Sequence, residues 1–414
     1  AGKVNVYNEN FFIDLSRYMM EWSVEVDGVQ ALCGTVSSLN IAPQATAEVS
    51  LGYDVEDILQ AAGIRSLDRH DVYLNVRYVL KRADGLLQAG EEVAYDQMVI
   101  NDAELPVFAD ASGLPEYGQD GDLHVFYGDM AFEGSANLRV SPWKAVFDAS
   151  AGSLVSYVLG EKEMIKSPLA PCVARAVIEN DLGAKLQNRF AAWRNPVMQL
   201  KGLEHKIENG VAVVTANYDM PSVQAKMTIT YTINGEGQIS VEQAMTTDKE
   251  AKISNMFRYG MRMELPARFN ELLYYGRGEV ENYCDRKSCA DVGIYHQKVS
   301  EQYHEELARP QESGTRSDLR YYNVLDSSGA GINIKAESLF SASALPYSQE
   351  QMDYTVGAAQ RHSGDLKPDG KTHLCFDLVQ QGVAGINSWG AWPLEQYRIT
   401  YKDYTFKFII SPVR

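Results

Sequence analysis

The sequence predicts an all-β protein made of two consecutive antiparallel β-sandwiches. Two-residue alternation of apolar and polar side chains is its dominant pattern, and this pattern is typical of strands buried on one face of an antiparallel sheet. Helical signals are short, and no regular strand–helix alternation of the kind that a parallel sheet requires is present. The 414 residues are 45% hydrophobic, which is enough apolar material for two sizeable cores.

The clearest strands lie at residues 72–80, 225–233 and 404–410. In the first of these, Val72, Leu74 and Val76 face one way while the residues between them face the other. Residues 234–237, Asn-Gly-Glu-Gly, follow the second strand and predict a hairpin turn, because Asn and Gly tolerate positive φ.

Three short helices are expected between the strands. Each has a recognisable start, stop or apolar face. The predicted segments are 55–62, with Asp54 as N-cap and Gly63 as the end; the stretch in which Leu186, Phe190 and Trp193 share a face; and 352–359, preceded by the capping-box pair Ser348 and Gln351.

A domain boundary is predicted near residues 133–136. The stretch 101–134 is rich in Gly, Asp and Pro, and a new run of alternating residues starts at Asn137. Residues 1–133 then suit an immunoglobulin-like sandwich of about seven to nine strands. Residues 136–414 suit one much larger two-sheet sandwich.

The charge balance argues against two classes of partner. Thirty-eight Lys and Arg stand against 55 Asp and Glu, a formal net charge of −17. This charge repels phosphate backbones and anionic lipid, so we expect neither nucleic-acid nor membrane binding. Neutral ligands such as sugars carry no such penalty.

No catalytic or metal-binding motif is evident. The seven histidines are isolated and show no HExxH spacing, and the five cysteines suit neither a disulfide framework nor a zinc site. Asn-Glu pairs, which occur in retaining glycosidases, appear at Asn8-Glu9 and Asn270-Glu271 but follow no parallel strand. Polar residues on the wet face of a strand explain both pairs.

Three dense clusters of polar residues and glycine remain. They cover 175–183, then 274–286 together with 309–316, and finally 382–390. In the first cluster, acidic and amide groups precede a helix and suit N-capping and the helix dipole. The Arg and acidic residues of the second are numerous enough for a bidentate network beneath a loop.

The third cluster is a Gly-rich loop that contains Trp389. An aromatic face can stack on the C–H face of a sugar, and Asn387 and Ser388 can hydrogen-bond to its hydroxyl groups. Because Trp389 lies between glycines and outside any alternating run, we expect its side chain to be exposed or half-exposed.

At these clusters the chain resembles the C-terminal part of the large bacterial β-galactosidases of glycoside hydrolase family 2. The family patterns are R-A-P-x-D-N-D-x-G, Y-G-x-G-P-x-E-N-Y-x-D-R, P-x-E-x-G-x-R, R-H and G-x-G-G-D-x-S-W. Residues 175–183, 275–286, 310–316, 361–362 and 382–389 follow these patterns in that order, with departures at Val177, Glu179, Glu279, Ala384 and Ile386. Upstream, residues 22–28 and 42–44 resemble the immunoglobulin-like domain that follows the catalytic barrel in that family.

This resemblance implies an immunoglobulin-like sandwich followed by a large antiparallel supersandwich similar to galactose mutarotase. The catalytic barrel, with both catalytic glutamates and the magnesium ligands, is absent from the sequence. The resemblance therefore implies no catalytic residue, cofactor or metal here, and a role for Trp389 in lining the shallow part of the sugar pocket. Ile386 departs from the family pattern, which has an acid there, and Asn387 can still cap the loop.

Substrate contacts are assigned to Trp389, Asn387 and Ser388. Implied partners are β-galactoside sugars and the missing N-terminal and barrel domains; a homo-oligomer and a cytoplasmic or periplasmic location both stay open. A structural polar shell is expected to converge from Arg175, Glu179, Asn180, Asp181, Arg277, Glu281, Asn282, Asp285 and Arg286.

Two other functions fit some of these residues. One is a stand-alone carbohydrate-binding module that uses Trp389. The other is a mutarotase-like sugar epimerase with His304 or His362 as acid/base. The epimerase needs a paired His and Glu, which the sequence does not reveal.

Overall fold

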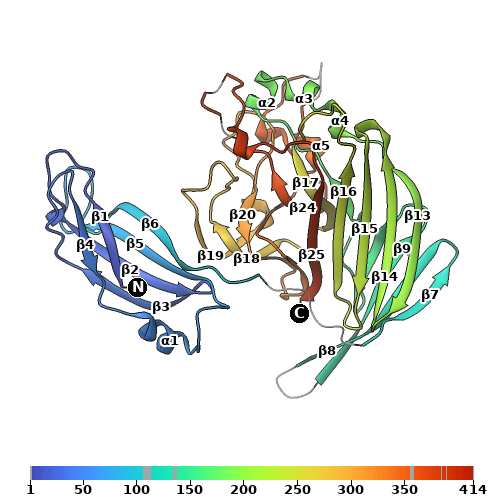
Figure 1. Cartoon of the computed structure of the whole chain (residues 1–414), viewed down its shortest axis with the longest axis horizontal. Coiled ribbons are helices and arrows are strands. Elements are labelled where there is room, and N and C mark those ends of the chain that lie inside the picture. The colour runs from blue at the N-terminus through green and yellow to red at the C-terminus, as the bar shows by residue number, and fades with distance from the viewer. Residues whose placement is uncertain are drawn as a thin grey trace. The chain divides into compact units, whose positions relative to one another are not determined.

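The structure is a computed structural model that describes residues 2–105, 113–133, 138–354, 359–383, 385–387 and 389–413. Its described part consists mainly of strands in antiparallel sheets (Figure 1), so the predicted all-β class is confirmed. The chain divides into two compact units. One contains residues 1–104 with 292–294, and the other contains residues 105–291 with 295–414.

The smaller unit has two sheets, β1-β4 and β3-β2-β5-β6. Residues 2–105 contain six strands, fewer than the expected number. Met20, Val24 and Ile58 are buried at the centre of its core. The strands are β1 (Lys3–Tyr7), β2 (Tyr18–Val26), β3 (Val29–Val36), β4 (Thr46–Ser50), β5 (Val72–Leu80) and β6 (Glu92–Asn101), with the short helix η1 (Leu15–Arg17) between β1 and β2.

Helix α1 (Val55–Ala62) forms where the capping signals predicted it. Asp54 and Asp57 make a reciprocal capping box, in which each carboxylate accepts the backbone N–H of the other residue. Gly63 ends the helix in the left-handed conformation, with φ of 67°.

The division between the units falls earlier than the predicted boundary at 133–136. Strand β7 (Glu116–Asp120) pairs with β8 (Leu123–Glu133), and β8 pairs with β9 (Leu138–Asp148), so both strands belong to the larger unit. The Gly- and Asp-rich composition that suggested a linker is here the turn chemistry of a hairpin, with Gly121 at φ of 59°. Residues 134–137 lie outside the described part.

The larger unit contains three sheets. The first has the order β11-β10-β9-β8-β7, the second β12-β17-β24-β23-β20, and the third β13-β14-β15-β16-β25-β22-β21-β18-β19. One continuous apolar core lies among them. Its remaining strands are β10 (Ser153–Leu159), β11 (Lys162–Glu163), β12 (Ala170–Cys172), β13 (Gln199–Glu208), β14 (Val211–Met220), β15 (Ala225–Ile233), β16 (Ile239–Thr247), β17 (Arg258–Pro266), β18 (Glu271–Gly278), β19 (Asp291–Lys298), β20 (Arg316–Leu319), β21 (Tyr321–Leu325), β22 (Gly331–Ala336), β23 (Phe340–Leu345), β24 (Lys371–Gln380) and β25 (Tyr404–Val413).

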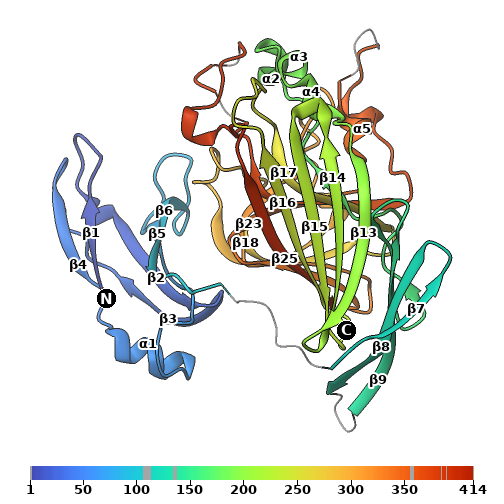
Figure 2. The same ribbon diagram turned by 45° about the vertical axis from the view of Figure 1, so that its right-hand side comes forward.

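The predicted hairpin at 234–237 joins β15 to β16. Asn234 organises the turn, because its side-chain Oδ1 accepts the backbone N–H groups of Glu236 and Gln238 at 3.1 and 3.0 Å. Strands β13 to β16 then run side by side in the nine-stranded sheet (Figure 2).

An aromatic cluster joins the five-stranded sheet β7–β11 to the edge strand β13. The imidazole rings of His124 and His205 have centroids 4.8 Å apart, and Tyr117 lies 4.5 Å from His205. Burial and the neighbouring His124 lower the pKa of His205.

The helices of the larger unit are short, and α2, α3 and α4 gather at one end of it in both views (Figures 1 and 2). Leu186, Phe190 and Trp193, which we expected on one helical face, are all buried, but the helix is divided in two at Phe190. The helices of this unit are α2 (Glu179–Gly183), α3 (Leu186–Arg189), α4 (Ala191–Arg194) and α5 (Gln349–Met352), with single turns η2 (Pro221–Val223), η3 (Val299–Glu301), η4 (Ser363–Asp365) and η5 (Glu395–Tyr397).

The helix predicted at 352–359 is wrong in its position. The capping box between Ser348 and Gln351 forms, but the helix that it starts covers only Gln349–Met352. Asp353 instead leaves the helix in an extended conformation, with φ of −79° and ψ of 158°. Residues 355–358 lie outside the described part.

Candidate functional site

A cavity of about 440 Å³ lies where the three polar clusters meet. Its wall includes Glu179 and Asn180 from α2, Glu281 and Arg286 from the loop after β18, and residues of the loop that carries Trp389. Segments that lie about a hundred residues apart in sequence therefore share one site.

An ion pair with almost no solvent exposure underlies the first cluster. The Nη2 atom of Arg175 lies 3.1 Å from each carboxylate oxygen of Asp181, and the two side chains are 0% and 2% exposed. Burial raises the pKa of Asp181, and the Arg175 guanidinium opposes this effect. Arg175 also donates to the carbonyl groups of Gln381, at 2.5 Å, and Gly382, at 3.2 Å, and thereby fixes the start of the third cluster.

Asn180 holds the other end of that loop. Its Nδ2 donates to the carbonyl of Asn387 at 3.1 Å, and its Oδ1 accepts the N–H of Gly390 at 3.2 Å. The two backbones meet closely, since a Cβ on Gly183 would lie 2.8 Å from the Cα of Gly390. Glycine is therefore required where α2 contacts the loop.

The loop presents Trp389 to solvent. Its indole side chain is 88% exposed, which confirms the expected exposure. Asn387 caps the loop, because its Oδ1 accepts the N–H of Trp389 at 2.9 Å. Asn387 thus makes the loop-capping contact expected of it, and its Oδ1 already has one partner within the loop. Ser388 lies outside the described residues.

The second cluster contributes two carboxylates that fix loops. Glu281 pairs with Arg286 and accepts hydrogen bonds from Ser313 Oγ at 2.8 Å and Gly314 N at 2.9 Å. Asp285 accepts the N–H of Val383 at 3.0 Å and so joins the second cluster to the third.

Two further predicted shell members, Asn282 and Glu179, make contacts of their own. Asn282 is fully buried and shapes its own loop, with Nδ2 on the carbonyls of Arg277 and Val280 at 3.0 Å each. Glu179 contacts Arg309 at 3.4 Å and is 52% exposed.

Arg277 was expected in the shell, but its guanidinium binds elsewhere. Its Nε donates to Asp318 at 2.6 Å and its Nη1 donates to the carbonyl of Ala290 at 2.7 Å. Lys287 also binds Asp318, at 2.7 and 2.9 Å. Burial acts to raise the pKa of Asp318, but the hydrogen bonds from Lys287 and Arg277 bring it below its usual value. Because its partners do not line the cavity, Arg277 belongs to a separate network.

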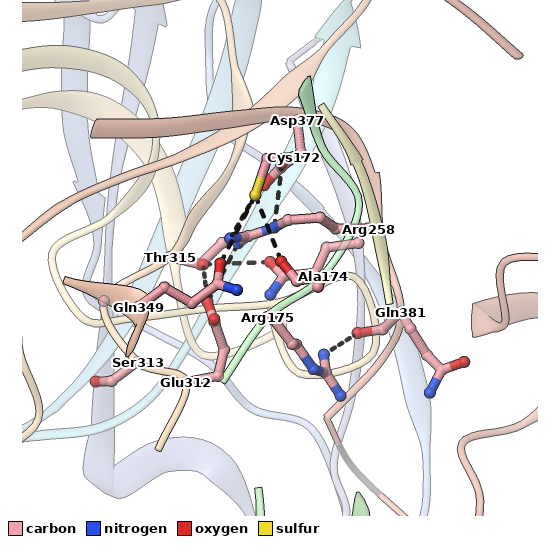
Figure 3. A network of polar contacts seen from close by, with 12 residues as sticks. Cys172, Ala174, Arg175, Arg258, Glu312, Ser313, Thr315, Gln349, Asp377 and Gln381 are labelled. Carbon is pink, nitrogen blue, oxygen red and sulfur yellow. Dashed lines mark hydrogen bonds and ion pairs between the residues drawn. The ribbon is translucent and has the colours of Figure 1, made fainter. Parts of the chain in front are cut away.

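A buried charge cluster around Arg258, not expected from the sequence, includes Glu312 of the cavity wall (Figure 3). Arg258, 1% exposed, lies 3.3 Å from Glu312 and 3.2 Å from Asp377. Burial raises the pKa of Asp377 well above its ordinary value, and Arg258 opposes this effect. Glu312 was visible in the third family pattern. Asp377 was not, because a register shift in the pairing of β17 with β24 breaks the alternation from which its face could be predicted.

The other candidates from the sequence do not join the cavity. His304 lies 3.1 Å from the exposed Glu306, and His362 contacts the carbonyl of Ala308 at 3.2 Å. Asn8 is fully buried and donates to the carbonyls of Ile13 and Ile41. No three His, Cys, Asp or Glu residues in the described ranges are grouped so that they could hold a metal ion. Nor does any described helix have the length and apolar character needed to cross a bilayer.

Sequence comparisons with known proteins lead to β-galactosidases. The family described as β-galactosidase small chain matches residues 139–410, and the one described as β-galactosidase, domain 4 matches residues 4–101. A β-galactosidase of Priestia megaterium is 28% identical over 100% of this chain and 38% of its own length. The β-galactosidase BgaC of Bifidobacterium adolescentis is 26% identical over 96% of this chain and 36% of its own length.

The chain thus spans less than two fifths of the length of these relatives. Among solved structures, the galactose 1-epimerase of Lactobacillus acidophilus aligns with 69% of this chain and 98% of its own, at 11% identity and a TM-score of 0.31, too low to support an argument. The resemblance to the C-terminal part of bacterial β-galactosidases is confirmed, because these matches span nearly the whole of this chain. By the match over residues 139–410, the chain belongs to the β-galactosidase small chain family.

Proposed function

We propose that this chain is a non-catalytic part of a β-galactosidase that hydrolyses terminal β-D-galactosides, and that it completes the wall of the sugar pocket. The single observation that carries the proposal is the 88% exposed Trp389 on a loop fixed by buried polar groups. An exposed indole on a loop held by hydrogen bonds presents an aromatic face that a sugar ring can contact. Its flat face suits stacking on the C–H face of a galactosyl ring.

The buried groups support this role by fixing where the indole stands. Arg175 and Asp285 hold residues 381–383 at the start of the loop, and Asn180 holds its end. A loop fixed at both ends loses little conformational entropy when a ligand binds, which favours affinity. We assign the hydrolytic chemistry, with its two carboxylates and magnesium, to the part of the relatives that lies outside this chain.

Supporting assembly is the second element of the proposal. The relatives are more than twice as long as this chain, and nearly all of this chain aligns with each of them. Its two units would therefore contact further domains of the same enzyme. A stand-alone sugar-binding module stays the alternative, and the same experiments separate the two.

A chimera tests the role of Trp389. In the chimera, this chain replaces the matching segment of the Priestia megaterium β-galactosidase. Trp389→Ala should raise KM for nitrophenyl-β-galactoside by about ten- to thirtyfold, equivalent to roughly 1–2 kcal/mol of lost stacking, with a smaller effect on kcat. Trp389→Phe should recover part of the loss.

Ile386→Ala is the matched control. Ile386 is 84% exposed in the same loop but has no aromatic face, so its removal should leave KM unchanged. An unchanged KM in Trp389→Ala would show that this indole does not line the pocket. Hydrolysis by the isolated chain, after removal of contaminating host enzyme, would contradict the non-catalytic assignment.

A further inference from the structure

The cavity beside the Trp389 loop has an unused hydrogen-bonding group on its wall. Gln311 lines the cavity and is only 4% exposed, yet its side-chain amide makes no hydrogen bond to any described residue. Its amide atoms are not among the fully buried polar atoms of the described residues that lack a partner, so they reach solvent at the cavity wall and their hydrogen-bonding capacity is open to a ligand. An amide left free at a cavity wall is therefore a position at which a polar ligand can bind.

The other groups on the wall define which ligand fits. Three carboxylates, of Glu179, Glu281 and Glu312, stand against one guanidinium, that of Arg286. Each carboxylate is paired with an arginine, Glu179 with Arg309, Glu281 with Arg286 and Glu312 with Arg258, so the described wall offers no uncompensated cation to a phosphate or another anion. The carboxylates can accept hydrogen bonds from hydroxyl groups, and the amide can both accept and donate them. The ring of Tyr283, whose centroid lies 5.3 Å from the Arg286 guanidinium, adds an apolar surface. A neutral polyhydroxylated ligand suits this wall best.

Size and position point to a saccharide unit next to the one at Trp389. The volume of about 440 Å³ lies within the range of roughly 300–1,000 Å³ usual for small-molecule sites. Gly385 and Asn387 line the cavity, and they belong to the same loop as Trp389. A ligand that extends beyond the sugar stacked on the indole could reach the cavity along this loop.

We propose that this cavity is a second saccharide subsite, in which Gln311 hydrogen-bonds to a hexose unit of an extended β-galactoside while Trp389 stacks on its neighbour. The inference rests on the proposed function for the role of Trp389. It adds a substrate preference for trisaccharides over disaccharides and a specificity-determining residue, Gln311, that lies in a different segment.

Binding to the isolated full chain tests the subsite. Titration calorimetry would compare lactose with the trisaccharide β-galactosyl-lactose. We expect the trisaccharide to bind at least tenfold more tightly, and Gln311→Leu to remove this difference without weakening lactose binding. Gln199→Leu, the same substitution at an exposed position on β13, should change neither affinity.

Trp389→Ala separates this inference from the proposed function. It should weaken both sugars by a similar factor and leave the preference for the trisaccharide. Equal affinity for the two sugars in the unaltered chain would overturn the subsite even if Trp389→Ala weakens both, and the role of Trp389 would then survive. If Gln311→Leu fails to fold, Gln311→Ala replaces it, and an unchanged preference in a folded variant overturns the proposal.

Discussion

The buried pair of Arg175 and Asp181 allows a prediction about stability to be worked out from the structure. Arg175→Met removes the cation but keeps most of the side-chain volume. Asp181, 2% exposed, then has no cation, and the carbonyls of Gln381 and Gly382 lose their donor. Breaking one side of a buried ion pair typically costs about 3–5 kcal/mol, so we expect a loss of that size in the free energy of unfolding.

Arg277→Met is the matched control for this substitution. It also removes an arginine from an ion pair, but Asp318 is 20% exposed and keeps its two contacts with Lys287. We therefore expect a loss of only about 1 kcal/mol. Urea unfolding at pH 7 measures both values, with the fluorescence of the buried Trp143 and Trp193 reporting on the larger unit.

The loss in Arg175→Met should also depend on pH. Without Arg175, burial acts unopposed by it and raises the pKa of Asp181 further above the ordinary value of 3.8. An acid whose pKa is higher in the folded than in the unfolded state loses stability as the pH rises between the two values. The variant should thus be closest to the unaltered protein near pH 4, and Arg175→Met with Asp181→Asn should recover much of the loss at pH 7. Equal losses in the two arginine variants, or a loss independent of pH, would refute this reasoning.

Three further predictions concern the loop and the packing. Asn180→Ala removes two hydrogen bonds from the Trp389 loop and should raise KM of the chimera about fivefold, for roughly 1 kcal/mol; unchanged initial-rate kinetics would contradict this. Gly34→Ala places a Cβ 2.5 Å from the indole of Trp22 and should destabilise the smaller unit by about 1–3 kcal/mol in thermal unfolding, whereas a stability equal to the unaltered chain would show that the sheet yields. The lowered pKa of His205 should make stability fall as the pH drops below its ordinary value of 6.5, because protonation favours the unfolded chain; His205→Phe should lose this dependence, and a variant that keeps it would point to another group.

Much of the site was predictable because its residues occur in short motifs. Charged residues in loops punctuated by glycine need partners if they are partly buried, and from this we expected Arg175, Asn180 and Glu281 to lie together. Asn180 and Glu281 line the same cavity, and Arg175 binds the start of the loop that Asn180 holds. The expectation failed for Arg277. This residue stands in the same motif as Glu281, but it lies near the end of strand β18, where its guanidinium binds Asp318. The motif alone carried no information about this partner.

Local sequence determined the all-β class, the cap of α1 and the hairpin at 234–237, because alternation, capping and turn chemistry depend on residues only a few positions apart. Tertiary structure alone decided that strands β7 and β8 belong to the larger unit and that Arg258 meets Asp377. Both outcomes depend on strand register across long separations, and a single bulge changes the face on which every later side chain lies. The partner of a buried charge is therefore fixed by which strands pair and in what register, and neighbouring residues in the sequence do not encode that choice.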